Sequence, residues 1–374
     1  MPPASSNSNS ASVLLSLQRP LARKRSRSEV SNLDSAGAST KRNRITDYHG
    51  TLDLVPQIAY AIDSSGTNRD DTSETYHSDS DLEDTVSVSS SILEGTERYG
   101  RGFHNYEGAP YSIPTDEEEI DQQNRQHSRF VSSLKPFDVY DTRGLCLSPV
   151  PHGAKILDLG TGSGKLSIEL GFTFPSCAIQ GCDIAVIQEC GGPNVVFQIW
   201  DFRRPDLWSK EQFDLILMRD LSFTISSWQD TMRLAFEHTK PGGYVEIAYV
   251  GLPKIPDGIE MPELRKWLTT VNEAATERGI HLVSPKDISS IVGKAGFEVT
   301  HHCQFHWPVL QEPDRLRGIS ADLVSHKLGM DDKGIQLAVL LRDIRNEIRK
   351  CSKDILYEVH VVSAQRPNDG IVYR

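Results

Sequence analysis

Residues 155–164 read Lys-Ile-Leu-Asp-Leu-Gly-Thr-Gly-Ser-Gly, an apolar strand that runs directly into a glycine-rich turn. The glycines of the turn, Gly160, Gly162 and Gly164, alternate with other residues and allow left-handed backbone angles that a side chain would oppose. We expect a helix over 165–172, whose free N–H groups face the turn. The stretch therefore predicts a strand–turn–helix unit in which a ligand approaches the main chain closely.

Two well-known phosphate-binding motifs fail at single positions of this turn. The dinucleotide fingerprint requires another glycine three positions after its second one, where this chain has Lys165. A P-loop requires Ser or Thr after its Gly-Lys pair, where Leu166 stands, and an earlier glycine, where Leu159 stands. We therefore reject both NAD and a P-loop nucleotide as the ligand.

The next predicted strand, 177–183, is a short apolar run that ends in a carboxylate. Asp183 follows the turn by about 20 residues, the spacing at which folds of this kind place an acid on ribose hydroxyls. A carboxylate is a suitable acceptor pair for the two hydroxyls. The turn and Asp183 together predict a cofactor that contains a ribose.

Asp158 followed by Gly160-x-Gly162-x-Gly164 resembles motif I of the class I S-adenosylmethionine-dependent methyltransferases. The resemblance implies that S-adenosylmethionine is the cofactor and that Asp158 and the turn hold its amino-acid end. It also implies that Asp201 and Phe202, which follow the third predicted strand (residues 194–200), contact the adenine. The predicted cofactor-binding residues are Asp158, Gly160, Thr161, Gly162, Gly164, Asp183, Ile184, Asp201, Phe202 and Arg219.

A longer set of residues resembles one family within this class, the fungal LaeA-like regulatory methyltransferases, which include the velvet-associated VipC type. The likeness is good over about residues 97–250 and looser beyond. It implies regulatory protein partners, of the velvet type or other methyltransferase or adaptor subunits. The residues that carry it are Gly100, Phe103, His104, Tyr106, Gly108, Tyr111, Pro114, Asp116, Glu119, Gln126, His127, Leu147, Pro149, residues 156–162, Phe174, Pro175, Ile187, Gln188, Asn194, Val195, Trp228 and residues 240–246.

Alternating strand and helix patterns predict a class I, Rossmann-like α/β fold with a mostly parallel seven-stranded sheet and helices on both faces. We divide the chain into a disordered tail (1–97), a lid segment (98–150) and a methyltransferase domain (151–374) with a helical insertion at about 308–352. We expect further strands at 194–200, 213–218, 244–250, from 296 and at 354–364, the last of them antiparallel. The expected helices cover 117–130, 228–239, 262–279, 285–295 and 315–350, with a break near Gly329.

The tail carries segregated charge although the formal net charge of the chain is −11. The net charge gives no electrostatic footprint for nucleic acid, so we predict no direct nucleic-acid binding. Basic clusters at Arg23–Arg27 and Lys41–Arg44 suit a nuclear-import receptor, which predicts a nuclear protein that is also found in the cytoplasm. A merely solvated tail and a mitochondrial presequence remain the alternatives.

No stretch approaches the length of a membrane span, and the six cysteines show no CxxC pair. We interpret the cysteines as reduced thiols, most of them buried. The cluster at 301–306 supplies at most two possible metal ligands to each face of a strand, short of the usual four. We therefore predict no metal site.

The end of the fourth strand lacks the acceptor motifs of amide, adenine and cytosine methyltransferases, and the chain lacks the paired glutamates of arginine methyltransferases. Tyr111, His127 and Asp220 are candidates for the acceptor side by predicted position alone, and no catalytic residue is assigned. Two hypotheses stay open. The chain is a working methyltransferase with an unassigned acceptor, or a cofactor-binding scaffold that docks velvet-type regulatory partners.

Overall fold

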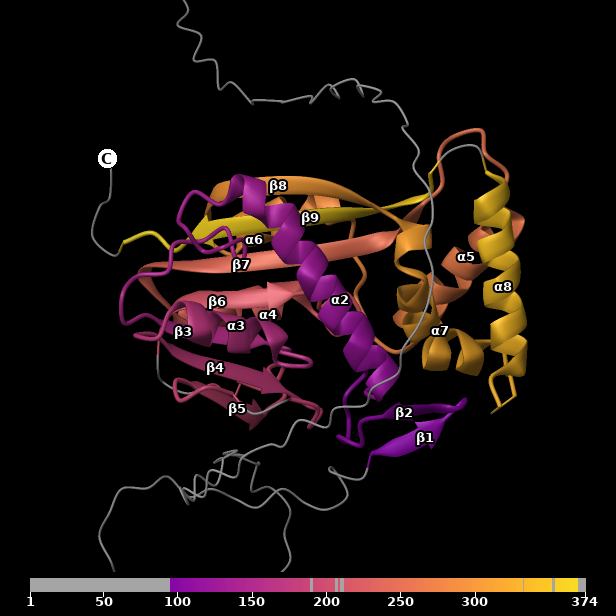
Figure 1. Ribbon diagram of the computed structural model, residues 1–374, viewed down its shortest axis with the longest axis horizontal. Coiled ribbons are helices and arrows are strands. Elements are labelled where there is room, and N and C mark those ends of the chain that lie inside the picture. The colour runs from indigo at the N-terminus through magenta and orange to yellow at the C-terminus, as the bar shows by residue number, and fades with distance from the viewer. Residues whose placement is uncertain are drawn as a thin grey trace, which may run out of the picture. The chain divides into compact units, whose positions relative to one another are not determined.

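The computed structural model describes residues 95–188, 191–205, 208, 212–331, 333–351 and 354–368, all within one compact unit, residues 55–374. Residues 1–94 of the predicted disordered tail, which include both basic clusters, lie outside the described residues. The last residues of the predicted tail, Thr96 and Glu97, instead lie in strand β1. Seven strands form one sheet in the order β5-β4-β3-β6-β7-β9-β8 (Figure 1). They are β3 Lys155–Leu159, β4 Ala178–Asp183, β5 Val195–Ile199, β6 Phe213–Arg219, β7 Thr239–Lys254, β8 Glu298–Pro308 and β9 Leu356–Gln365.

The first five strands in chain order are parallel, and β9 pairs antiparallel with both β7 and β8. This is the predicted fold, including the antiparallel last strand. The strand order reverses at β3, because β4 and β5 lie on one side of it and β6 lies on the other. A doubly wound sheet binds its ligands at this switch point, outside the carboxyl ends of the strands.

The central strands are apolar on both faces because helices cover both faces. In β3, Ile156 packs with helix α3 (Lys165–Thr173), whereas Leu157 and Leu159 pack on the opposite face. That opposite face is covered by α4 (Trp228–His238) and α6 (Ile288–Lys294). The burial of both faces explains why the strands read as continuous hydrophobic runs.

The remaining helices pack beside the carboxyl ends of the strands. They are α2 (Glu117–Leu134), α5 (Pro262–Glu277), α7 (Pro313–Lys327) and α8 (Ile335–Lys350). Helix α2 crosses in front of the sheet, and a small hairpin of β1 (Thr96–Arg98) and β2 (Arg101–Phe103) precedes it (Figure 1). The carboxylate of Asp116 caps α2 by accepting a hydrogen bond from the N–H of Glu119.

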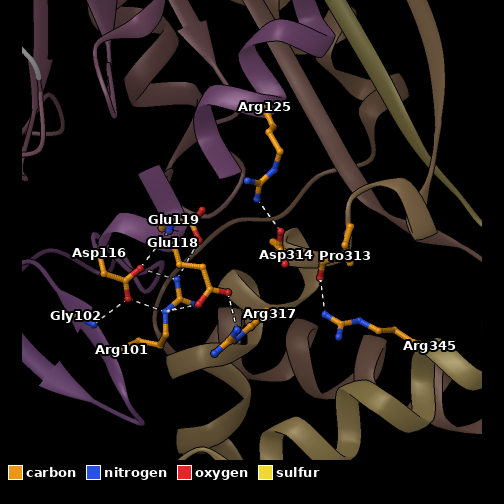
Figure 2. Close-up of polar contacts among 10 residues, drawn as sticks. All are labelled: Arg101, Gly102, Asp116, Glu118, Glu119, Arg125, Pro313, Asp314, Arg317 and Arg345. Atoms are coloured by element: carbon orange, nitrogen blue, oxygen red, sulfur yellow. Dashed lines mark hydrogen bonds and ion pairs between the residues drawn. The ribbon is translucent and has the colours of Figure 1, made fainter. Parts of the chain in front are cut away.

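Polar contacts tie this lid segment to α7, as Figure 2 shows. Arg125 of α2 donates to Asp314 at 2.6 Å, and Arg317 of α7 donates to Glu118 at 2.6 Å. Arg345 of α8 in turn donates to the carbonyl oxygen of Pro313, at the start of α7. Two segments that lie about 200 residues apart in sequence, α2 and α7, thus act as neighbouring walls.

The expected and observed boundaries differ most clearly at the start of β7. We expected a turn at 241–243 and a strand only from 244, but β7 already begins at Thr239. The strand absorbs the glycines as an irregularity in its pairing with β6, where the register shifts between Phe213 and Leu215, and Gly242 has a φ of +78°. Because such irregularities bend a strand without ending it, the glycine pair was a poor sign of a boundary.

Three of the described cysteines, Cys146, Cys177 and Cys182, are buried, and Cys303 and Cys351 are partly buried; all five are free thiols. No helix among the described residues has the length and apolar character needed to cross a membrane. In the same part of the chain, no group of three or more His, Cys, Asp or Glu residues is arranged to hold a metal ion.

Candidate functional site

A cavity lies at the switch point of the sheet, between the carboxyl ends of the strands and the lid segment. Of the ten predicted cofactor-binding residues, all except Gly164 line this one cavity. Gly164 instead forms the N-cap of α3, with a φ of +79°. The predicted residues on the wall are Asp158, Gly160, Thr161, Gly162, Asp183, Ile184, Asp201, Phe202 and Arg219.

The glycine turn is a tight segment with left-handed backbone angles, and hydrogen bonds to Asp158 hold it in place. Gly160 and Gly162 have φ values of +63° and +56°, which side chains rarely adopt. One oxygen of Asp158 accepts hydrogen bonds from the hydroxyls of Thr161, at 2.7 Å, and Ser167, at 2.8 Å. Burial raises the pKa of Asp158. Asp158 therefore shapes the turn as well as lining the cavity.

Asp183 closes β4 and faces the turn. Its Oδ2 accepts the N–H of Gly162 at 2.8 Å, and its Oδ1 accepts the N–H of Ala185 at 3.0 Å. Burial raises the pKa of Asp183, and these main-chain hydrogen bonds act in the opposite direction. Because each carboxylate oxygen has two lone pairs, both oxygens can still accept a hydroxyl donor from a ligand.

The lid segment bonds directly to the turn, which the sequence did not reveal. Gln123 of α2 accepts the N–H of Ser163 at 2.9 Å, and Asn124 accepts the Ser163 hydroxyl at 2.9 Å. A Cβ atom at Gly162 would lie 2.5 Å from the amide oxygen of Gln123. The turn therefore needs glycine at 162 for both its backbone angle and the close approach of α2.

The predicted adenine end of the cavity is formed by Asp201 and Phe202. Arg203 holds both oxygens of Asp201, with Nε at 2.8 Å and Nη2 at 2.6 Å, and also reaches the carbonyl oxygen of Gly108 in the lid segment. Phe202 is buried, and its ring lies near Gly160. This end of the cavity thus offers an aromatic side chain and a carboxylate held in place by a guanidinium.

Tyr111, His127 and Asp220, the candidates for the acceptor side, all line the cavity. Arg219 lies 3.1 Å from His127 Nδ1, and because a guanidinium only donates, Nδ1 is an acceptor and the ring proton is on Nε2. That Nε2 lies 3.1 Å from Glu169 but without hydrogen-bond geometry. Burial and the neighbouring Arg219 lower the pKa of His127 to about 4, so the ring is neutral at pH 7.

Asp220 stands at the carboxyl end of β6 in a left-handed conformation, with a φ of +55°. Its carboxylate forms an ion pair with Arg315 of α7, in which Arg315 Nη2 lies 3.0 Å from Oδ1. Gln126 also donates to Asp220, at 2.9 Å, and so does Ser222, at 3.1 Å. With these donors in place, Asp220 is an anchor for the lid and for α7.

Four charged residues of this wall were not predicted as site residues: Glu119, Lys165, Arg203 and Arg315. Burial raises the pKa of Glu119 to about 8. A signal for Glu119 exists in the sequence, because Glu119, Gln122 and Gln126 follow a helical spacing that continues to Phe130. Arg315 carries no such signal, since its partner Asp220 lies 95 residues away in the chain.

The comparisons with known proteins agree with this geometry. A sequence profile described as "Methyltransferase domain" matches residues 137–302. The chain is 26% identical to the methyltransferase pytC of Aspergillus terreus over 306 residues, 75% of this chain and 91% of that protein. It is 28% identical to the secondary metabolism regulator laeA of Aspergillus fumigatus over 58% of this chain and 59% of that protein. It is also 28% identical to the protein-methionine methyltransferase laeA of Emericella nidulans, over 55% of each chain.

The match to the laeA proteins thus spans a little over half of their length. The cavity fits the predicted cofactor by its chemistry, because carboxylates suit ribose hydroxyls and an ammonium group, and a glycine turn admits a polar end close to the main chain. The fold, the profile and the relatives agree. The chain contains a methyltransferase domain and is similar to the pytC and laeA proteins, and the chemistry of its cavity suits S-adenosylmethionine.

Proposed function

We propose that the chain is a regulatory methyltransferase that acts in the nucleus and influences the expression of genes for development and secondary metabolism. The observation that carries the enzymatic part is the placement of Asp158, the glycine turn and Asp183 around one cavity. The regulatory part is supported by the name of the laeA relatives, secondary metabolism regulators. The nuclear part is supported by the basic clusters Arg23–Arg27 and Lys41–Arg44.

In this proposal the chain's own groups position the donor and the acceptor and exclude water. Asp183 would hold the ribose, the turn with Asp158 the amino-acid end, and Phe202 with Ile184 the adenine. The bound cofactor supplies a methyl group on a sulfonium, which is already activated for displacement. The protein therefore contributes mainly alignment, and the lid contacts through Gln123 hold the turn while the site is covered.

The acceptor class is open to test, and one relative suggests a first candidate. The laeA protein of Emericella nidulans is named a protein-methionine methyltransferase. We therefore propose a protein acceptor for this chain as well. The proposal predicts that a protein band, rather than a small molecule, becomes labelled when the full chain meets a cell extract.

The alternative is a scaffold that keeps the cofactor and docks regulatory partners of the velvet type or adaptor subunits. One observation favours it. The acid at the end of β6, Asp220, already has Arg315, Gln126 and Ser222 as donors, so the usual place for an acceptor-binding motif is filled by the protein itself.

Transfer of labelled methyl separates the two hypotheses. The full chain is incubated with S-adenosyl-[methyl-³H]methionine and a whole-cell extract, beside the variant Gly162→Glu. A band labelled by the wild-type chain and absent with the variant supports the enzyme. Bound cofactor without any labelled product supports the scaffold.

The nuclear part has its own test. Replacement of Lys24, Arg25, Lys41 and Arg42 by Ala should move a fluorescent fusion of the full chain out of the nucleus, because an import receptor needs these charges. Unchanged nuclear accumulation would discard this assignment. An import receptor and velvet-type proteins are then the first partners to seek by affinity purification of the wild-type chain.

A further inference from the structure

The inward face of α2 is polar where it crosses the cavity. Glu119, Gln122 and Gln126 are buried and line the cavity, and the same face continues into Phe130 and Leu134, which pack in the hydrophobic core. A buried polar stripe opposed to a cavity is informative, because burial of polar groups is costly unless they have partners. The two glutamines are amides, and of these three side chains only that of Glu119 can ionise.

The acids beside Glu119 each have a guanidinium of their own (Figure 2). Arg101 of β2 holds Asp116 through two hydrogen bonds, at 2.6 and 2.7 Å. Arg317 of α7 holds Glu118 at 2.6 Å. The guanidinium groups of Arg101 in the hairpin and Arg317 in α7 are therefore already paired with acids other than Glu119.

The acid across the cavity is also neutralised, because Asp220 pairs with Arg315. Within the described residues, the only guanidinium within 4 Å of Glu119 is that of Arg101, whose Nη2 lies 3.8 Å away and already donates to Asp116. Among the described residues, Glu119 is therefore the buried acid at the start of α2 that lacks a hydrogen-bonded guanidinium of its own.

The fold makes room for this carboxylate instead of avoiding it. A Cβ atom at Gly318 of α7 would lie 2.5 Å from Glu119 Oε2, so glycine at this position lets the carboxylate approach α7 closely. Glu119 is only 6% exposed, and it lies on the cavity wall together with Tyr111 and Ile319. A buried, uncompensated acid that lines the site invites a cation from the ligand.

We propose that Glu119 is the counter-ion for the positive charge that the acceptor atom acquires on methylation, so that the acceptor is an uncharged nitrogen or sulfur nucleophile. This inference rests on the proposed enzymatic function of the cavity. A lone pair of the acceptor atom forms the new bond to the methyl carbon. The carbon–sulfur bond of the donor breaks with its electron pair left on sulfur, and the positive charge passes to the acceptor atom.

The two acceptor classes differ only in the fate of this positive charge after methyl transfer. A methylated amine is an ammonium and gives its proton to a carboxylate oxygen of Glu119, which restores a neutral amine. A methylated thioether has no proton to lose, and its sulfonium stays paired with Glu119 until release. In both cases the charge forms beside an acid that is preorganised for it.

The electrostatic surroundings suit this role. Burial raises the pKa of Glu119 to about 8; Arg101 and Arg315 lower it, and Asp116 and Asp220 raise it further. Tyr111 of the lid segment lines the same cavity, and burial together with the nearby acids Asp183 and Glu119 raises its pKa. A cation bound in the cavity would favour the ionised form of Glu119 and release its proton.

The test uses sinefungin, which carries an amino group where the donor carries its sulfonium methyl, and S-adenosylhomocysteine, which is neutral at that place. Affinities for the full chain are measured by calorimetry at pH 7.5, for wild type, Glu119→Gln and the control Glu118→Gln. Glu118 is the neighbouring acid and does not line the cavity.

We expect wild type and Glu118→Gln to prefer sinefungin over S-adenosylhomocysteine by about tenfold or more, the worth of one buried charge-assisted contact. Glu119→Gln should lose most of this preference while its affinity for S-adenosylhomocysteine is unchanged. Equal preference in wild type and Glu119→Gln, with both ligands bound, overturns the inference alone. Failure of wild type to bind either ligand overturns the proposed function as well.

A second measurement separates nitrogen from sulfur. The labelled product of the extract experiment is digested, and mass spectrometry locates the methyl group. Methyl on an amine nitrogen or on a thioether sulfur supports a counter-ion role for Glu119. Methyl on a carboxylate or phenolate oxygen, which is an anionic acceptor, contradicts it.

Discussion

Replacement of Glu119 by Gln should make the protein more stable at neutral pH, and the gain should grow with pH. In the native protein burial holds the pKa of Glu119 at about 8, against 4.5 for the ordinary group. The unfolded chain therefore loses this proton near pH 4.5, whereas the native protein keeps it until about pH 8. Between these values the native state binds more protons, so the free energy of unfolding of the wild type falls as pH rises.

The size of the effect comes from the same two pKa values. Each pH unit over which only the unfolded state is ionised costs the native state about 1.4 kcal/mol. Between pH 5 and pH 8 the wild type should lose about 3 to 4 kcal/mol relative to Glu119→Gln, whose amide does not titrate. Below pH 4.5 Glu119 is neutral in the native and in the unfolded protein, so the pH-dependent difference in the free energy of unfolding between wild type and Glu119→Gln should vanish.

Urea unfolding followed by fluorescence at pH 5.0, 6.5 and 8.0 measures this difference. Glu118→Gln is the matched control, because Glu118 is the adjacent residue, has an exposed side chain and pairs with Arg317. Its stability relative to wild type should change little with pH. If Glu119→Gln and wild type differ by the same free energy at all three pH values, Glu119 ionises normally and the argument for a buried, uncompensated acid fails.

Two further predictions concern the walls of the cavity. Gly160→Ala should lower the free energy of unfolding by about 1 to 3 kcal/mol more than Gly258→Ala, since both have positive φ but only at 160 would the new Cβ meet a neighbour, Leu221, at 2.4 Å. Equal melting temperatures for these two variants would contradict the tight packing of the turn. Arg315→Leu should cost about 1 to 3 kcal/mol in urea unfolding because it leaves the partly buried Asp220 without its ion-pair partner. Adding Asp220→Asn should recover part of that loss, and no recovery would show that the pair is not what stabilises this wall.

The parallel part of the fold was predictable because its signals are local. Strands buried on both faces read as apolar runs, and Asp158, the glycine turn and Asp183 each stand where a strand ends, so the topology brings them to one edge. The start of α2 was predictable for the same reason, since the acids of its first turn are neighbours in sequence, whereas the helix extends to Leu134, beyond the expected end at residue 130.

The acceptor side was less predictable because its contacts join distant segments. Arg315, which pairs with Asp220, and Gly318, which gives room to Glu119, both come from the helical insertion. Periodicity alone cannot say that the inward stripe of α2 faces a cavity rather than solvent at Glu119. The glycines at 242 and 243 led to the wrong prediction of a turn, whereas β7 runs through them. A bulge within a strand and a turn between two strands use the same residue types.

The central claim is that the cavity under α2 binds S-adenosylmethionine, and calorimetry with purified full chain tests it most directly. The wild type should bind the cofactor, and Gly162→Glu should not. In this variant a side chain would meet Gln123 at a left-handed position and place a second acid beside Asp183. Circular dichroism should show that the variant remains folded. A wild-type chain that ignores S-adenosylmethionine but binds NAD would contradict the account.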